Sequence, residues 1–311
     1  MLNRRKFISQ SALTAGAMLT GSSLLREILE DANSYRLTIL HTNDVHSRID
    51  PYPMDGGRNQ GLGGVIARAE LIEDVRKEQE HVLLLDAGDI FQGTPYFNLY
   101  KGEPEIKAMS SMKYDASTVG NHDFDAGLEN LANQLTRHAN FPMLICNYDF
   151  TGTTMEYKYE PYKIFKKGKL KIGVLGVGIE LKGLVPDNLA AGTTYLDPVQ
   201  QANRIANVLK NDKKCDFIVC LSHLGYQYGE NKISDVLFAE QSENIDLIIG
   251  GHTHTFMNAP VTRRNKLGKD VVINQVGFSG IILGRLDFDF SKISRKNLVN
   301  SASMRVIKKT I

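Results

Sequence analysis

The sequence has few cysteines and little net charge. Its three cysteines, Cys146, Cys215 and Cys220, cannot all pair within one chain. None belongs to a closely spaced zinc-type cysteine pair, and Cys146 and Cys220 end apolar runs, which favours buried free thiols. A formal net charge of +2 provides no bulk attraction to nucleic acid or anionic membranes. Recognition of a charged substrate therefore has to be local.

The sequence also lacks an apolar run long enough to form a permanent membrane anchor. The weakly apolar stretch Ser11–Leu25 contains Gly16 and Gly21, and it is shorter than the ~20 apolar residues of a spanning helix. The stretch follows Asn3–Ile8 (NRRKFI), whose paired arginines resemble a twin-arginine export signal. We interpret residues 1–34 as an export signal and linker, and expect a periplasmic or secreted protein. The alternative is a basic extension without a targeting role.

From Arg36 onward, short β-branched or leucine-rich runs alternate with stretches of helical period, which is typical of an α/β domain. The predicted strands are Arg36–His41, His81–Leu85, Ala116–Val119, Met143–Cys146, Asp216–Leu221 and Asp246–Ile249. The predicted helices are Val65–Glu80, Leu128–Arg137, Pro198–Asn211 and Ser234–Gln241. Two hairpins are predicted, Tyr162–Phe165 with Leu170–Val177 and Val271–Val276 with Ile282–Phe290. This mixture predicts one α/β domain at residues 35–311, with two packed mixed β-sheets flanked by helices.

Polar side chains of metal-ligand type follow five of the predicted strands. The five segments are Asn43–His46, Gly88–Asp89, Gly120–Asp123, Ser222–His223 and Gly250–His254. Ligands of α/β sheets bind beyond the carboxyl ends of the strands, so these segments can converge there. The pairs Asp44/His46 and His252/His254 are two residues apart, a spacing that in an extended chain points both side chains to one side. The glycines would let the backbone turn sharply around a small ligand.

In this order, the five segments resemble the calcineurin-like metallophosphoesterases, and among them the 5′-nucleotidases and their cyclic-phosphodiesterase relatives. The resemblance extends from about Leu37 to Phe290 and includes further blocks of sequence. These blocks are His41–Arg48, Gln92–Asn98, Gly120–Asp125 and Gly251–His254. The resemblance implies the calcineurin-like sandwich fold and a phosphate-ester substrate, with a nucleotide as the leading candidate.

The resemblance also implies two divalent metal ions. It places one ion on Asp44, His46, Asp89 and His254, and a second, bridged by Asp89, on Asn121, His223 and His252. Such mixed carboxylate, amide and imidazole ligands suit Zn²⁺, Mn²⁺, Fe²⁺ or Co²⁺. Two ions of this kind acidify a shared water and clamp the attacking and leaving oxygens, so a metal-bridging hydroxide is expected to attack phosphorus.

His122 and Asp125 are the expected catalytic pair, because the resemblance joins them. An imidazole held by a carboxylate can stay protonated and stabilise charge on the phosphoryl oxygens or protonate the leaving group. Asp125 could instead, or in addition, cap the helix predicted at Leu128–Arg137. Asn121 and Arg48 are the expected substrate contacts, although Arg48 could equally be a solvated loop residue.

The expected function is that of a dimetal, 5′-nucleotidase-like phosphomonoesterase. Family members carry a C-terminal domain that stacks the nucleobase, and we expect no such domain within residues 35–311. The alternatives are a phosphodiesterase acting on cyclic nucleotides and a non-catalytic metal-binding subunit of a split nucleotidase. A separately encoded substrate domain could dock near Phe91–Tyr100 and Tyr226–Tyr228, or the chain could be self-sufficient.

Overall fold

The computed structural model describes residues 35–291 and 295–308, so the predicted export signal lies outside the described residues. The chain divides into two compact units. Of the described residues, 35–37, 287–291 and 295–300 belong to the smaller unit, and within it Arg36 pairs with Asp289 at 2.7 Å. The larger unit comprises Thr38–Leu286 and Ser301–Ile311 and contains all the candidate site residues.

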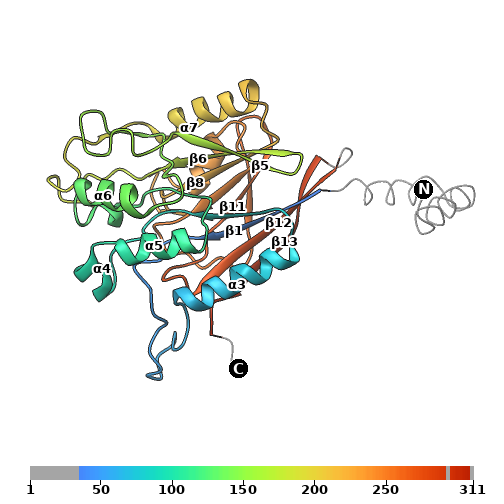
Figure 1. Ribbon diagram of the computed structural model, residues 1–311. Helices are drawn as coiled ribbons and strands as arrows, with labels where there is room; N and C mark the ends of the chain where they lie inside the picture. Colours follow the sequence, from blue (N-terminus) through green and yellow to red (C-terminus); the bar gives the residue numbers. More distant parts are fainter. Residues whose placement is uncertain (1–34, 292–294, 309–311) are drawn as a thin grey trace, which may run out of the picture. The chain divides into compact units, whose positions relative to one another are not determined.

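Two main sheets and a small third one form the frame (Figure 1). The five-stranded sheet has the order β13 (Arg295–Arg305), β12 (Ile282–Ser291), β1 (Tyr35–Thr42), β2 (Val82–Asp86), β3 (Ala116–Ser117). The six-stranded sheet has the order β10 (Val261–Arg264), β11 (Asp270–Asn274), β9 (Leu247–Gly250), β8 (Phe217–Ser222), β6 (Leu170–Val177), β5 (Tyr162–Lys167). A two-stranded sheet joins β4 (Tyr148–Asp149) to β7 (Thr194–Tyr195). The α/β class and the packed mixed sheets are confirmed.

Helices supply the apolar layers against these sheets. The helices are α3 (Val65–Glu78), α4 (Pro95–Tyr100), α5 (Glu103–Ser111), α6 (Leu128–His138), α7 (Pro198–Asn207) and α8 (Asp235–Gln241). Buried side chains of α3, α5 and α6 form one core with β1 and β2, and those of α7 and α8 form another with β6, β8 and β9. Figure 1 shows α7 beside β6 and β8. None of the described helices is both long and apolar enough to cross a bilayer.

The register of the parallel strands aligns their carboxyl ends. In the first sheet Thr42 lies opposite Asp86, which lies opposite Ser117. In the second sheet Ser222 lies opposite both Val177 and Gly250. Because each predicted ligand segment starts at one of these aligned residues or within three residues of it, strand pairing brings the segments to the same sheet edges.

A buried polar contact joins the two sheets. His41 on β1 and Asn274 on β11 approach to 2.8 Å through Nε2 and Nδ2. Burial lowers the pKa of His41 to about 3, so its imidazole is neutral and accepts this hydrogen bond. His41 therefore has a structural role, in keeping with its predicted place in the first strand.

Two sequence predictions of local structure are wrong. The hairpin predicted between Val271–Val276 and Ile282–Phe290 does not form, because β11 pairs with β9 and β10 while β12 belongs to the other sheet. The strand predicted at Met143–Cys146 makes only isolated bridges, from Met143 to Ser117 and from Leu144 to Glu160. Apolar runs predict burial, but the choice of pairing partner depends on distant segments.

The hairpin of β5 and β6 is confirmed, with Lys167 opposite Leu170. Helices α4 and α5 were missed. The first begins after Thr94, whose hydroxyl accepts a hydrogen bond from the Tyr96 N–H at 3.3 Å, and has a proline in its first turn. The second also has an early proline, after Gly102, and these start signals were available in the sequence.

Candidate metal centre

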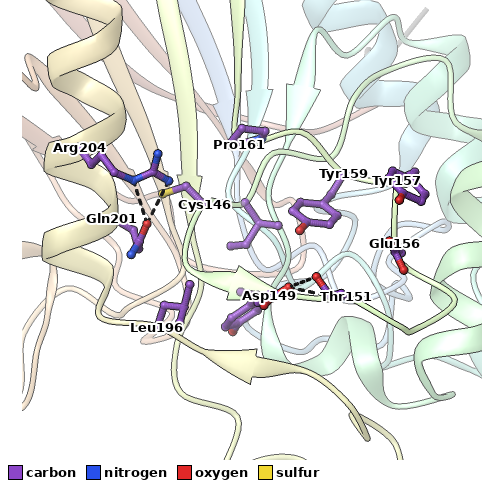
Figure 2. Close-up of a pocket in the computed structure, with 12 residues that line it drawn as sticks. Cys146, Asp149, Thr151, Glu156, Tyr157, Tyr159, Pro161, Leu196, Gln201 and Arg204 are labelled. Atoms are coloured by element: carbon purple, nitrogen blue, oxygen red, sulfur yellow. Dashed lines mark hydrogen bonds between the residues drawn. The ribbon is translucent and has the colours of Figure 1, made fainter.

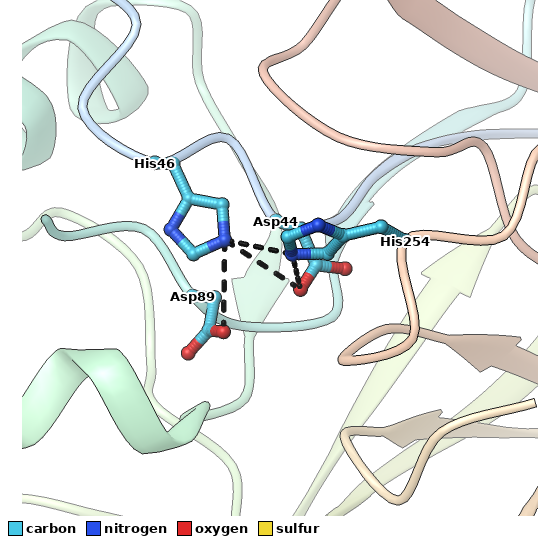
Figure 3. A group of neighbouring side chains, drawn as sticks. All are labelled: Asp44, His46, Asp89 and His254. Atoms are coloured by element: carbon cyan, nitrogen blue, oxygen red, sulfur yellow. Dashed lines mark hydrogen bonds and ion pairs between the residues drawn. The ribbon is translucent and has the colours of Figure 1, made fainter. Parts of the chain in front are cut away.

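Side chains from distant segments converge in two groups, each with its potential ligand atoms within 4.8 Å of one another. The first group is Asp44, His46, Asp89 and His254, and the second is Asp89, His223 and His252. Figure 3 shows the first group, in which Nε2 of His46 lies 2.9 Å from Nε2 of His254 and 3.8 Å from Oδ2 of Asp89. Asn121 joins the second group, since its Oδ1 lies 2.8 Å from Nδ1 of His252. Asp89 is common to both groups.

The backbone at these residues is left-handed. Asp44, His46, Asp89, His252 and His254 have φ values between 50° and 70°. The extended-chain argument from their spacing is therefore wrong, although the paired side chains do converge. Non-glycine residues avoid this region, and such strain persists where the surrounding structure holds it, often at functional sites.

Backbone hydrogen bonds join the first ligand loop, which carries Asp44 and His46, to the loop that carries Asp89. The Asp44 N–H donates to Gly88 O at 2.9 Å, and the His46 N–H donates to Asp89 O at 3.0 Å. The last ligand loop, which carries His252 and His254, is held by Asp44, whose carboxylate accepts a hydrogen bond from the His252 N–H at 3.0 Å. Three segments far apart in the sequence thus constrain one another.

Asp123 is a buried residue whose role the sequence reasoning missed. Its carboxylate accepts hydrogen bonds from four backbone N–H groups: those of Asp89 (3.1 Å), Ile90 (2.9 Å), Phe91 (3.1 Å) and Gly120 (2.8 Å). This arrangement ties the loop that carries Asp89 to the loop that carries Asn121. The sequence signal for this role was Asp123 itself, an acidic residue at the end of the predicted ligand segment Gly120–Asp123.

Glycine is required at Gly88 and Gly120 for different reasons. Gly88 has a φ of 87°, which fits the expected sharp turn. Gly120 has an ordinary φ of −101°, but a Cβ there would collide with Oδ1 of Asp89. Close approach, and not turn geometry, explains the second glycine.

The hydrogen-bonding pattern of the imidazoles fits a cation. Nδ1 of His223 lies 2.6 Å from Ala87 O and must donate to it, which leaves a lone pair on Nε2 of the neutral ring. That buried Nε2 makes no hydrogen bond to any residue in the described ranges, yet it lies 3.1 Å from Oδ2 of Asp89. A lone pair facing a carboxylate is unfavourable unless a proton or a metal ion lies between them.

The charge balance supports the same conclusion. Burial alone would lower the pKa of His223, but Asp89 and Asp44 outweigh it and raise the pKa to about 10. Burial likewise opposes ionisation of Asp89, but His223 and His46 hold its pKa well below the ordinary value. The two buried carboxylates thus require positive charge in this volume. The donor set of carboxylate, amide and imidazole suits divalent transition metals.

His122 lies beside the two groups and belongs to neither. Its Nδ1 lies 2.8 Å from Oδ2 of Asp125, its backbone N–H donates to Oδ1 of Asp89, and its ring lies 5.3 Å from that of His46. The hydrogen bond to Asp125 raises the pKa of His122. The cap of α6 is Gly127, without a side-chain hydrogen bond, so the alternative role of Asp125 as the cap of this helix is wrong.

Arg48 lies outside both groups, with its guanidinium 4.0 Å from the centre of the Tyr52 ring. A separate cavity of about 570 Å³ is lined by residues such as Cys146, Tyr159 and Arg204 (Figure 2). None of its lining residues belongs to either ligand group. All three cysteines are free and buried, as predicted for Cys146 and Cys220.

Known proteins resemble this chain in sequence and in fold. Residues 37–256 match the family described as Calcineurin-like phosphoesterase. The chain belongs to this family. It is 35% identical over 295 residues to the snake venom 5′-nucleotidase of Crotalus adamanteus, covering 89% of the chain and 48% of the relative. It is also 35% identical over 302 residues to a 5′-nucleotidase of Vibrio cholerae, covering 89% of the chain and 52% of the relative.

The solved structures agree with this assignment. The crystal structure of a 5′-nucleotidase precursor from Thermus thermophilus superposes with a TM-score of 0.77 at 30% identity, covering 88% of this chain and 55% of the other. The chain of this calcineurin-like phosphoesterase spans about half the length of the curated relatives it matches.

We predict that Asp123→Asn destabilises the fold and loosens metal binding, because an amide nitrogen would face backbone donors. The expected loss in free energy of unfolding is about 1–3 kcal/mol, the cost of leaving buried polar groups unpaired. Denaturant unfolding and metal analysis would measure both effects. The control is Asp149→Asn, since Asp149 also accepts a backbone hydrogen bond, from Thr151, but in an exposed setting. Equal behaviour of the two variants would contradict the role of Asp123.

Proposed function

We propose that this chain is a two-metal hydrolase of phosphate esters, and specifically a 5′-nucleotidase-like phosphomonoesterase. The observation that carries the proposal is the pair of ligand groups sharing Asp89, with the His122–Asp125 pair beside them. Family membership and the 5′-nucleotidase relatives support the same reaction class.

In this proposal one ion is held by Asp44, His46, Asp89 and His254, and the other by Asp89, Asn121, His223 and His252. The ions are zinc, manganese, iron or cobalt. When bound, they lower the pKa of water and neutralise charge on the phosphoryl oxygens.

The protein's own groups then orient the substrate and move a proton. The Asp125 carboxylate pairs with Nδ1 of His122, which raises the pKa of the imidazole and fixes the direction of Nε2. His122 is 40% exposed in its side chain, so this proton is accessible to a bound ester. We propose that it stabilises the phosphoryl oxygens and protonates the leaving group. Asn121 and Arg48 are proposed to contact the substrate.

We also propose that the site is completed by a further substrate-binding domain. An aromatic and aliphatic patch on α4 supports this proposal, since Leu99 is 73% exposed and Tyr100 is 52% exposed and stacked with Tyr96. Phe91 and Phe97, in the same predicted docking segment, are buried and belong to the core. The matched relatives are about twice as long as the part that this chain covers, which leaves room in them for such a domain.

Export is a further part of the proposal. The paired arginines at Asn3–Ile8 support export through a twin-arginine route to the periplasm or the medium. Fractionation and N-terminal sequencing would test this route. Mature protein in the cytosol with an intact N-terminus would contradict it.

Asp89→Asn is predicted to lower metal content and activity together, because Asp89 is shared by both ligand groups. The parent should hold about two ions per chain and lose turnover when a chelator is added. Elemental analysis and hydrolysis of an aryl phosphate measure the two properties. Hydrolysis at the parent rate by Asp89→Asn would show that the shared-ligand assignment is wrong.

His122→Ala should keep both ions and lose on the order of 10²–10⁴-fold in kcat, the usual contribution of a positioned acid or base. Asp125→Asn should fall between the parent and this variant, since it leaves the imidazole in place without its charged partner. If His122→Ala loses an ion, His122 is a ligand and its assigned role is incorrect.

The chain alone is predicted to discriminate poorly among phosphate esters, because a substrate held mainly through its phosphate leaves its remaining part in water. The measurement is kcat/KM on AMP, on unrelated monoesters and on cyclic and linear diesters. Strong selectivity without an added protein would contradict the separate substrate domain. A preference for diesters would favour a phosphodiesterase, and metal binding without turnover would favour a non-catalytic subunit.

A further inference from the structure

The segment Gln275–Ser279 connects β11 to the start of the other sheet and lies against the first ligand loop. The Val276 N–H donates to Oδ1 of Asn43 at 2.9 Å, and Nδ2 of Asn43 donates to Gly277 O at 2.6 Å. The Ser279 N–H donates to Asp44 O at 2.7 Å. The segment contributes no ligand, but it is fixed relative to Asp44.

The same segment is also fixed to the last ligand loop. The side-chain amide of Gln275 donates to Gly251 O and accepts from the Thr255 N–H, and the Gly277 N–H donates to Thr255 O at 3.0 Å. Gly277 has a φ of 77°, and a Cβ there would collide with the ring of Phe256. This close packing places Phe278 directly beside the loop that carries His254.

Phe278 stacks on His254. Their ring centroids lie 5.2 Å apart with an angle of 25° between the planes. The ring of Phe256 meets Phe278 at 5.6 Å and 69°, an edge-to-face contact, and is itself 47% exposed. Phe278 thus lies between a candidate ligand and a second aromatic ring.

His254 is held differently from two other candidate ligands. Nδ1 of His223 is hydrogen-bonded to Ala87 O, and Nδ1 of His46 lies 3.3 Å from Phe91 O. Within the parts of the chain that the structure describes, no residue pairs with Nδ1 of His254, and its side chain is 41% exposed. A hydrogen bond from the second ring nitrogen is the usual means of orienting a histidine ligand, so His254 needs another constraint.

We propose that Phe278 is a positioning residue that orients the imidazole of His254 by stacking, in place of that hydrogen bond. The proposal rests on the assignment of His254 as a metal ligand. The stack fixes the plane of the His254 ring, so that its Nε2 points toward Asp44 and His46 (Figure 3). This Nε2 lies 3.4 Å from Oδ1 of Asp44 and 2.9 Å from Nε2 of His46. Phe278 acts through His254 and does not touch the reacting atoms.

The test compares three variants by metal retention, measured as ions per chain after timed exposure to a chelator. Phe278→Leu fills the space without a flat ring, and it should weaken retention of one of the two ions by about 10–100-fold, the usual effect of losing an outer partner of a ligand. Phe278→Tyr keeps the ring and should retain both ions as the parent does. Phe256→Leu is the matched control, since Phe256 contacts Phe278 and should leave retention unchanged.

The outcomes separate this role from the proposed function. Parent-like retention in Phe278→Leu, loss in Phe278→Tyr, or equal loss in Phe256→Leu would overturn the role of Phe278. If the parent retains two ions but hydrolyses no ester, the enzymatic proposal fails while the expected variant pattern still supports the stacking role. A parent that retains no ion would overturn both proposals.

Discussion

The candidate site depends on holding five of its candidate ligand residues in left-handed backbone conformations. Each such residue costs on the order of 1–3 kcal/mol relative to a relaxed conformation, so the strain needs compensation from outside the loops. Hydrogen bonds between the loops at Asp44, Asp89 and His252 supply that compensation. The left-handed conformations let these short loops direct the side chains of Asp44, Asp89 and His254 toward one another.

Strand register determines where these loops meet. The parallel strands end level with one another within each sheet, at Thr42 and Asp86 in one and at Ser222 and Gly250 in the other. Asp123 then joins two loops of the first sheet through four backbone N–H groups, and the Gln275–Ser279 segment joins the first and last ligand loops. The candidate site is therefore held by hydrogen bonds to segments that follow strands of both sheets.

Electrostatics explains why this site suits cations. Asp44 and Asp89 are almost fully buried. The nearby imidazole of His223 uses its Nδ1 in a hydrogen bond to the backbone oxygen of Ala87. Buried negative charge without a partner is costly in free energy, so positive charge between the carboxylates stabilises the fold. Divalent ions could provide that charge. His122 lies beside the two ligand groups, and its Nδ1 is paired with the carboxylate of Asp125.

The sequence by itself determined the α/β class and most of the helices and parallel strands, because hydrophobic period is a local property. Its resemblance to the calcineurin-like metallophosphoesterases supplied the candidate site residues. It could not determine that β11 and β12 enter different sheets, since pairing depends on distant strands. It also could not show the left-handed backbone at Asp44 and His254, the four donors around Asp123 or the stacking of Phe278. Tertiary structure alone decided these features, because contacts between segments far apart in the chain hold conformations that no local preference would select.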